Sequence, residues 1–125
     1  MTQQIVPKLV VDGGRAALDW YRTALNARIG EVHQHGGLVA YADFVILETH
    51  LSLKDGDGTD VSAAALGVPG PILQVLVEDP DEIAAAMLEH GAQEIFPVAD
   101  QDYGARAGRL RDPFGVQWLV STPLS

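Results

Sequence analysis

The sequence contains no cysteine among its 125 residues, which removes several kinds of chemistry at once. Without thiols the chain forms no disulfide, thiolate metal site or cysteine nucleophile. It also lacks an apolar run of roughly 18 residues, so no transmembrane helix and no membrane partner are expected. The amino-terminal residues do not join a basic region to a long apolar segment, so nothing indicates secretion and a cytoplasmic location is expected.

Basic residues are also scarce, with 8 Lys and Arg against 17 Asp and Glu and a formal net charge of −9. A nucleic acid would be repelled by this charge, so no nucleic-acid partner is expected. A cationic small ligand would be attracted, although solubility is the simplest interpretation of the acidity. The apolar content of 47% is typical of a globular protein, and the length predicts a single domain over residues 1–125.

The first half of the chain predicts one strand, one helix and three further strands. Asp12 precedes a pair of glycines and is a candidate helix N-cap, and Asn26 is a plausible helix end. The expected strands cover 5–11, 28–34, 38–46 and 50–54, and the helix covers 15–25.

The same order recurs after a linker of small residues. In the second half Asp79, Pro80 and Glu82 predict a capped helix start, and Gly91 predicts its end. The strands are expected at 72–78, 94–98, 105–111 and 117–122. Both halves therefore read β-α-β-β-β, with an offset of 66 residues from Val11 to Val77. The predicted fold class is α+β, with module 1 at about 1–55, a linker at about 56–70 and module 2 at about 71–125.

The stretch DPFG at 112–115 predicts a tight turn between the last two strands. Asp112 can hydrogen-bond to its own turn backbone, Pro113 presets φ for the bend, and Gly115 supplies a positive φ. This is the strongest local motif in the chain.

With these motifs the chain resembles the vicinal oxygen chelate superfamily, which includes glyoxalase I, extradiol dioxygenases and bleomycin-resistance proteins. It is most similar to the PhnB-like and bleomycin-resistance-like branch. The segments that carry the resemblance are KLVVDGGRAALDWYRTALNA, HGGLVAYADF and DQDYGARAGRLRDPFGVQWLVST. The resemblance implies two βαβββ modules that form a curved, half-barrel mixed sheet with a concave cleft and helices on the outer face. It also implies a homodimer.

Metal-dependent members of this superfamily hold a divalent ion with His, Gln or Glu on the first and last strands of each module. Alignment of the turns places these positions at Val6, Ser52, Ile72 and Leu119. Three of the four are aliphatic and the fourth is a hydroxyl, which makes a poor ligand set for a divalent ion. We therefore expect no metal and no other cofactor, which argues against glyoxalase and dioxygenase chemistry.

Strand alternation divides the sheet residues into a cleft set and a core set. Among the histidines, only His50 joins the cleft set, and no histidine pair has metal-ligand spacing. Tyr103 matches an aromatic residue that precedes glycine in bleomycin-resistance proteins. Arg106 and Arg109 point in opposite directions, and the sequence leaves open which of them faces the cleft. The predicted ligand-binding cleft comprises Lys8, Tyr41, His50, Ser52, Gln74, Tyr103, Arg106, Gln117 and Leu119, and the predicted core comprises Leu9, Val11, Leu51, Leu53, Val75, Val77, Trp118 and Val120.

The favoured function is a metal-free dimer that binds and sequesters a small molecule, of cationic or aromatic character and including antibiotics. The alternative is a lyase, isomerase or dioxygenase of the same superfamily that uses either an atypical metal site or a metal-free acid–base pair. His50 with Glu48 or Asp43 is the nearest candidate for this chemistry. A third hypothesis is a vestigial cleft in a protein that acts only through protein contacts. The residues identify no catalytic group, so enzymatic activity is left open.

Overall fold

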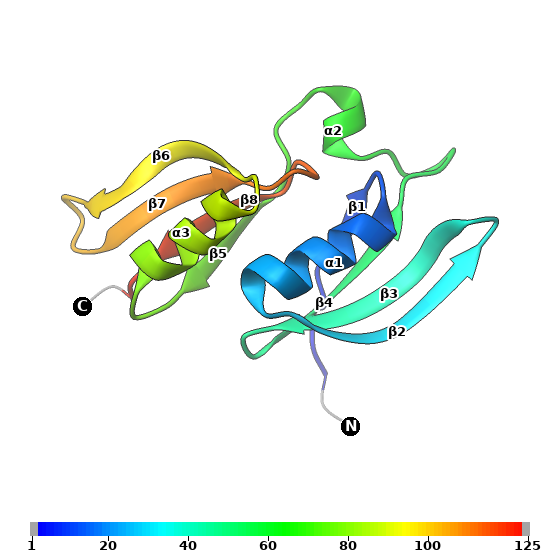
Figure 1. Cartoon of the computed structure of the whole chain (residues 1–125), viewed down its shortest axis with the longest axis horizontal. Coiled ribbons are helices and arrows are strands. Elements are labelled where there is room, and N and C mark those ends of the chain that lie inside the picture. The colour runs from blue at the N-terminus through cyan, green and yellow to red at the C-terminus, as the bar shows by residue number, and fades with distance from the viewer. Residues whose placement is uncertain (1–2, 124–125) are drawn as a thin grey trace.

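The computed structural model describes residues 3–123 and consists of two similar modules joined by a linker (Figure 1). Each module contains four strands and one long helix, and the linker contains one short helix. Module 1 contains β1 (Lys8–Val11), α1 (Gly14–Leu25), β2 (Arg28–His35), β3 (Leu38–Ile46) and β4 (Thr49–Asp55), the linker contains α2 (Ala63–Leu66), and module 2 contains β5 (Ile72–Leu76), α3 (Pro80–Glu89), β6 (Gln93–Asp100), β7 (Arg106–Arg111) and β8 (Gln117–Ser121).

The two modules have the same sheet topology. The strand order is β1-β4-β3-β2 in module 1 and β5-β8-β7-β6 in module 2. In module 1, β1 runs parallel to β4 with Lys8 opposite Ser52, and in module 2, β5 runs parallel to β8 with Gln74 opposite Leu119. The predicted α+β fold with a repeated βαβββ unit is therefore confirmed. The two sheets are curved and separate (Figure 1).

The linker contains a short helix that the sequence analysis did not predict. Ser62 caps α2 by accepting a hydrogen bond from the Ala65 backbone N–H at 3.1 Å. Farther along, Gly70 lies so close to the Gly115 carbonyl that a side chain at position 70 would collide with it. The linker therefore packs against the turn between β7 and β8. Among the helices that the structure describes, none has the length and apolar content to cross a membrane.

The start of α1 differs from the sequence expectation. The N-cap residue is Gly13, at φ 92, rather than Asp12, and no side chain of the cap residue bonds to the helix. The carboxylate of Asp55, at the end of β4, takes this role instead. It accepts hydrogen bonds from the backbone N–H groups of Gly13 at 2.7 Å, Gly14 at 2.9 Å and Val39 at 2.8 Å. The glycine adopts the left-handed conformation that brings its N–H toward Asp55.

The ends of the other long helix follow the sequence expectation. Asp79 caps α3 by accepting from the Glu82 N–H at 3.2 Å, and Pro80 occupies the first turn. Gly91, at φ 98, follows the helix end. These contacts join residues only a few positions apart, which is why the local pattern predicts them.

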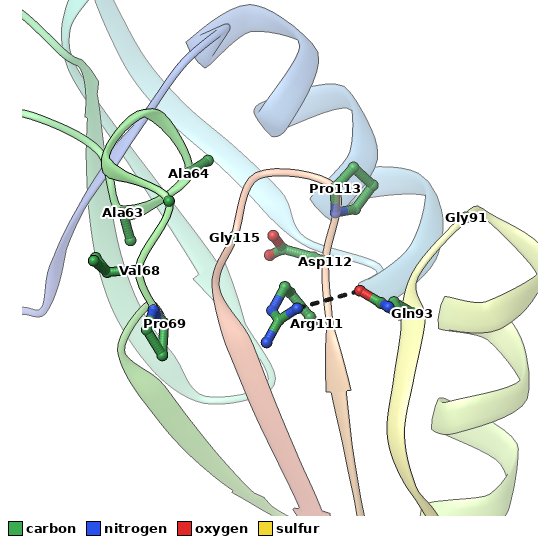
Figure 2. A pocket seen from close by; sticks show the side chains of 11 residues that line it. Ala63, Ala64, Val68, Pro69, Gly91, Gln93, Arg111, Asp112, Pro113 and Gly115 are labelled. Carbon is green, nitrogen blue, oxygen red and sulfur yellow. Dashed lines mark hydrogen bonds between the residues drawn. The ribbon is translucent and has the colours of Figure 1, made fainter.

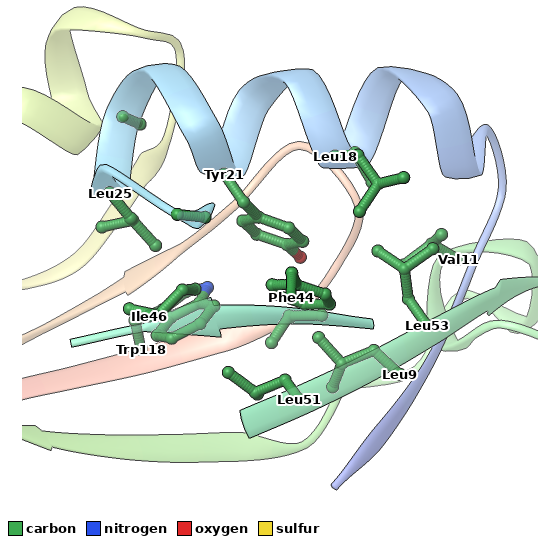
Figure 3. Packing of buried hydrophobic residues seen from close by; sticks show 14 of the residues in the cluster. Leu9, Val11, Leu18, Tyr21, Leu25, Phe44, Ile46, Leu51, Leu53 and Trp118 are labelled. Carbon is green, nitrogen blue, oxygen red and sulfur yellow. The ribbon is translucent and has the colours of Figure 1, made fainter. Parts of the chain in front are cut away.

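A single hydrophobic core joins the two modules on the helix side of both sheets (Figure 3). Tyr21 of α1 stacks on Phe44 of β3, with ring centroids 5.5 Å apart, and meets Trp118 of β8 edge-on at 5.8 Å. Trp20 connects the helices, because its Nε1–H donates to the His90 carbonyl at 2.7 Å. The predicted core residues are buried, with Val77 partly so: Leu9, Val11, Leu51, Leu53, Val75, Trp118 and Val120.

The carboxylate of Asp112 bonds to two aromatic residues of this core, and the residue is only 3% exposed. One of its oxygens accepts from the backbone N–H groups of Phe114 at 2.9 Å and Val116 at 3.0 Å, which closes the predicted DPFG turn. The other accepts from the Tyr21 hydroxyl at 2.7 Å and from Trp118 Nε1 at 2.9 Å. Burial raises the pKa of Asp112 above its ordinary value, and the donors of Trp118 and Tyr21 oppose this shift.

Replacement of Tyr21 by Phe should destabilise the protein by about 1.5–3 kcal/mol, because it removes a buried donor to a charged acceptor while preserving the ring. Urea denaturation at neutral pH measures this difference. Tyr103→Phe is the control, since Tyr103 is 56% exposed, and should change the free energy of unfolding by less than about 0.5 kcal/mol. Equal effects of the two substitutions would contradict the proposed role of the Tyr21–Asp112 bond.

The Tyr21→Phe difference should also increase as pH rises through the Asp112 pKa. Loss of the Tyr21 donor raises the pKa of Asp112 further in the folded variant. The folded wild-type chain and the folded variant thus have different Asp112 pKa values, both above the ordinary 3.8. At a pH between these two values, the folded variant binds more protons than the folded wild-type chain. The loss of stability consequently grows with pH over that window and is smaller below it.

Replacement of Asp55 by Asn should destabilise the protein by about 1–3 kcal/mol. The three backbone N–H donors bond to both oxygens of the carboxylate, whereas an amide has only one oxygen that can accept. The matched control is Asp12→Asn, in an exposed residue at the position where the sequence predicted the cap. It should change the free energy of unfolding by less than about 0.5 kcal/mol. If thermal or urea denaturation gave the reverse order, the cap would belong to Asp12.

Candidate functional site

Each sheet has one face covered by helices and one face turned away from them, called here the open face. Strand alternation assigns the residues, because side chains directly opposite each other on paired strands share a face. The open face of module 1 carries Lys8, Tyr41, Asp43, His50 and Ser52, and the open face of module 2 carries Ile72, Gln74, Arg109, Arg111, Gln117 and Leu119.

On module 1, four of the predicted cleft residues share the open face: Lys8, Tyr41, His50 and Ser52. Lys8, Ser52 and Asp43 stand side by side on three neighbouring strands. Lys8 Nζ lies 4.7 Å from the centroid of the Tyr41 ring, within the range of a cation–π contact. Ser52 is buried, whereas Lys8, Tyr41 and His50 are exposed. This face therefore presents a cation held against an aromatic ring, next to a small hydroxyl.

On module 2, three of the predicted cleft residues share the open face. Gln74, Leu119 and Arg109 form one row across three strands, and Gln117 lies in the next row, opposite Arg111. Gln117 is buried, and its side-chain amide donates to the Gly70 carbonyl at 3.2 Å. It therefore anchors the linker, while Gln74 and Leu119 remain accessible.

Arg106, which the sequence placed in the cleft, lies on the helix side instead. Its Nε and Nη2 donate to the two carboxylate oxygens of Asp81 on α3, at 2.7 and 3.0 Å, and Nη1 reaches Asp100 at 3.2 Å. Asp81 next to Arg106 raises the pKa of the guanidinium beyond its ordinary value. Of Arg106 and Arg109, it is Arg109 that lies on the open face, because it stands opposite Leu119. The prediction that Arg106 lies in the cleft is wrong, and this residue instead forms an ion pair that holds α3 against its sheet.

The sequence contains a signal that distinguishes Arg109 from Arg106. The five-residue connection around DPFG pairs Arg111 with Gln117, and counting back along both strands pairs Arg109 with Leu119. Since Leu119 was assigned to the cleft, Arg109 follows it there. Tyr103 lies in the turn between β6 and β7, outside both open faces, and its stacking role stays a prediction.

Four cavities on the described part of the chain have volumes between about 280 and 630 Å³. In none of these four do open-face residues of the two modules meet. One cavity of about 550 Å³ lies beside the DPFG turn, between the linker and Gln93, with Arg111 projecting into it (Figure 2). Another, of about 430 Å³, separates the turn before β4 from β5.

The residues at the four metal-ligand positions of the superfamily do not fit a divalent ion. Val6, Ile72 and Leu119 have no donor atom, and Ser52 offers one buried hydroxyl. Residues 3–123 contain no group of three or more His, Cys, Asp or Glu side chains close enough to hold a metal ion. No step of a mechanism is therefore assigned to such an ion.

The acid–base pair that the sequence offers as an alternative is His50 with Glu48 or Asp43. His50 and Asp43 share the open face of module 1, on neighbouring strands. The Asp43 carboxylate accepts instead from the Glu31 backbone N–H at 3.2 Å. Within residues 3–123, no hydrogen bond joins His50 to either carboxylate.

The acidic loop at 55–60 is closed by a cation from the chain itself. Lys54 Nζ bonds to Asp57 at 2.7 Å and to Asp60 at 2.6 Å. Lys54 and the backbone N–H groups of Asp60 and Thr59 hold the pKa of Asp57 well below its usual range. The chain's own cation therefore occupies the space between the Asp57 and Asp60 carboxylates.

Comparison with known proteins gives matches over almost the whole chain. The family model described as the Glyoxalase/Bleomycin resistance protein/Dioxygenase superfamily matches residues 3–120. An uncharacterized protein of Mycobacterium bovis is 30% identical over 124 residues, which cover 94% of this chain and 82% of the relative.

Two solved structures illustrate the similarity in fold. The PhnB protein from Bacillus cereus, titled a putative 3-demethylubiquinone-9 3-methyltransferase, has a TM-score of 0.70 at 16% identity, covering 97% of this chain and 100% of its own. The fosfomycin resistance protein FosX from Listeria monocytogenes has a TM-score of 0.71 at 12% identity, covering 100% of this chain and 94% of its own. At these identities the similarity concerns the fold alone.

Proposed function

The chain belongs to the Glyoxalase/Bleomycin resistance protein/Dioxygenase superfamily, and we propose that it binds a small molecule on its open faces without a divalent metal. Binding alone, with no chemical step, would then sequester the molecule. The antibiotics that the family description and the FosX structure name indicate one class of ligand to examine.

The observation that carries this proposal is the donor set at the four ligand positions. Val6, Ile72 and Leu119 place aliphatic carbon where a metal-dependent relative would need an electron-pair donor. Leu119 lies beside Gln74 on the open face of module 2, and Ile72 is 46% exposed. These side chains favour contact with an apolar part of a ligand over coordination of a cation.

The polar groups around these apolar residues can orient a ligand. Lys8 and Tyr41 offer a cation and an aromatic ring on module 1, and Gln74 offers an amide on module 2. A mostly apolar surface with a few fixed polar groups is the usual composition of a small-molecule site.

We further propose that the protein acts as a homodimer. In the strand order, β1 and β5 each have a neighbour on one side only, so both modules end in an open edge. Exposed apolar side chains lie on β5, where Leu76 is 55% accessible. A second copy that covered these edges would bring open faces of the two modules together and enclose the ligand.

A neutral aromatic probe tests metal-independent binding. N-phenyl-1-naphthylamine should bind saturably, with the same affinity in the presence of EDTA and of added Mn²⁺, Ni²⁺ or Zn²⁺, as measured by its fluorescence. Tyr41→Ala should weaken binding by a factor of about 2 to 13, which corresponds to an aromatic contact of 0.5–1.5 kcal/mol. Leu88→Ala, on the exposed face of α3, is the control and should leave the affinity unchanged.

Elemental analysis of the protein used in this titration measures its metal content and can contradict metal-free binding. A stoichiometric divalent metal that survives gel filtration, together with loss of probe binding in EDTA, would overturn the proposal in favour of a metal-dependent enzyme. Gel filtration with light scattering measures the mass, and a strictly monomeric protein that binds the probe would contradict the dimer alone.

A further inference from the structure

Two arginines on the open face of module 2 have no carboxylate partner among the residues that the structure describes. Arg109 and Arg111 are two residues apart on β7 and therefore point to the same side of the sheet. No ion pair within residues 3–123 involves either of them. We propose that this pair, called here the arginine pair, recognises an oxyanion of the bound small molecule, a carboxylate or a phosphonate.

The strongest evidence is the state of the Arg109 side chain. Its Nε is buried and has no hydrogen-bond partner among the described residues. The guanidinium carbon lies 5.4 Å from the centroid of the Phe96 ring, which holds the planar group against an aromatic face. A buried donor on a charged group without an acceptor is unfavourable, so an acceptor from outside the chain would relieve it.

Arg111 extends the same surface toward the DPFG turn. Its Nη1 donates to the amide oxygen of Gln93 at 3.2 Å, and the side chain reaches the cavity of about 550 Å³ that Figure 2 shows. This neutral partner orients the guanidinium without cancelling its charge. The remaining N–H donors of Arg111 are available to a molecule in the cavity.

The arginine pair is half-buried and forms no ion pair within residues 3–123, whereas the other cations without an ion pair there are exposed: Lys8, Arg15 and Arg28. The remaining cations are paired. Lys54 and Arg106 each bond to two carboxylates, and Arg22 pairs with Asp19 at 2.8 Å. The net charge of −9 favours a cationic ligand at long range, but the charge next to the site determines which group binds there. On module 2 this local charge is positive.

The chemistry of guanidinium groups selects the ligand class. A planar fork of N–H donors matches the oxygens of a carboxylate or a phosphonate, and each charge-assisted bond is stronger than a neutral one. Residues two apart on a strand are separated by about 7 Å, which lets the two guanidiniums approach one oxyanion from both sides. This inference rests on the proposed function, to which it adds the anionic group of the ligand.

Nuclear magnetic resonance of the arginine Nε–H groups provides the test. Arg109→Lys identifies the Arg109 signal by its loss. In the wild-type chain, phenylphosphonate, benzoate or both should shift that signal saturably, and affinity should fall as sodium chloride is added. Benzyl alcohol and benzylamine have the same ring without the anion and should leave the signal in place.

Substitutions then separate recognition from folding. Arg109→Gln should weaken binding of the anionic probe by at least about tenfold, and Arg109→Lys, which keeps the charge but loses the fork, should weaken it less. Arg15→Gln removes an exposed cation on α1 and should leave the affinity unchanged. Circular dichroism melting confirms that each variant is folded.

Two results distinguish failure of this inference from failure of the proposed function. The arginine pair alone would be overturned if Arg109→Gln left the affinity for the anionic probes unchanged. The same conclusion would follow if neither anion shifted the Arg109 signal while N-phenyl-1-naphthylamine still bound. Anion binding that needs Arg109 and also a divalent metal would support the arginine pair and contradict metal-free binding.

Discussion

The buried carboxylate of Asp112 is the contact on which the arrangement of the two modules depends. It accepts four hydrogen bonds, two from its own turn and two from Tyr21 and Trp118. Tyr21 belongs to the helix of module 1, while the turn and Trp118 belong to module 2. Since the two sheets share no strand pairing, this group and the aromatic core around it hold the modules together. The desolvation of one carboxylate is offset by four donors in fixed positions.

Because the modules join through their helix sides, the open face of each sheet lies outside the shared core. Residues such as Lys8, Gln74 and Arg109 do not belong to the hydrophobic core, so their side-chain chemistry can vary without loss of the fold. A scaffold of this kind accommodates metal donors in one relative and aliphatic side chains in another. For the same reason, the similarity to FosX shows a shared fold and does not by itself show a shared activity.

Much of the fold was predictable because it depends on neighbours in the chain. The Asp79 cap, the DPFG turn and the alternation of β4 and β8 all follow from contacts or orientations within a few residues. The candidate site was predictable only in part. Lys8, Ser52, Gln74 and Leu119 came from alternation and lie on the open faces. Arg106 was misplaced because alternation along β7 alone does not say which face is open, and the register that the DPFG connection sets against β8 was not applied to it.

The sequence by itself determined the order of the elements, the repeat of the βαβββ unit and the aliphatic character of the metal-ligand positions. Tertiary structure alone decided which carboxylates serve donors that are distant in the sequence. Asp55 caps a helix that begins 41 residues earlier, and Asp112 bonds to a tyrosine 91 residues away. The physical reason is that a hydrogen bond requires proximity in space, and only packing of the complete core brings such distant residues within about 3 Å.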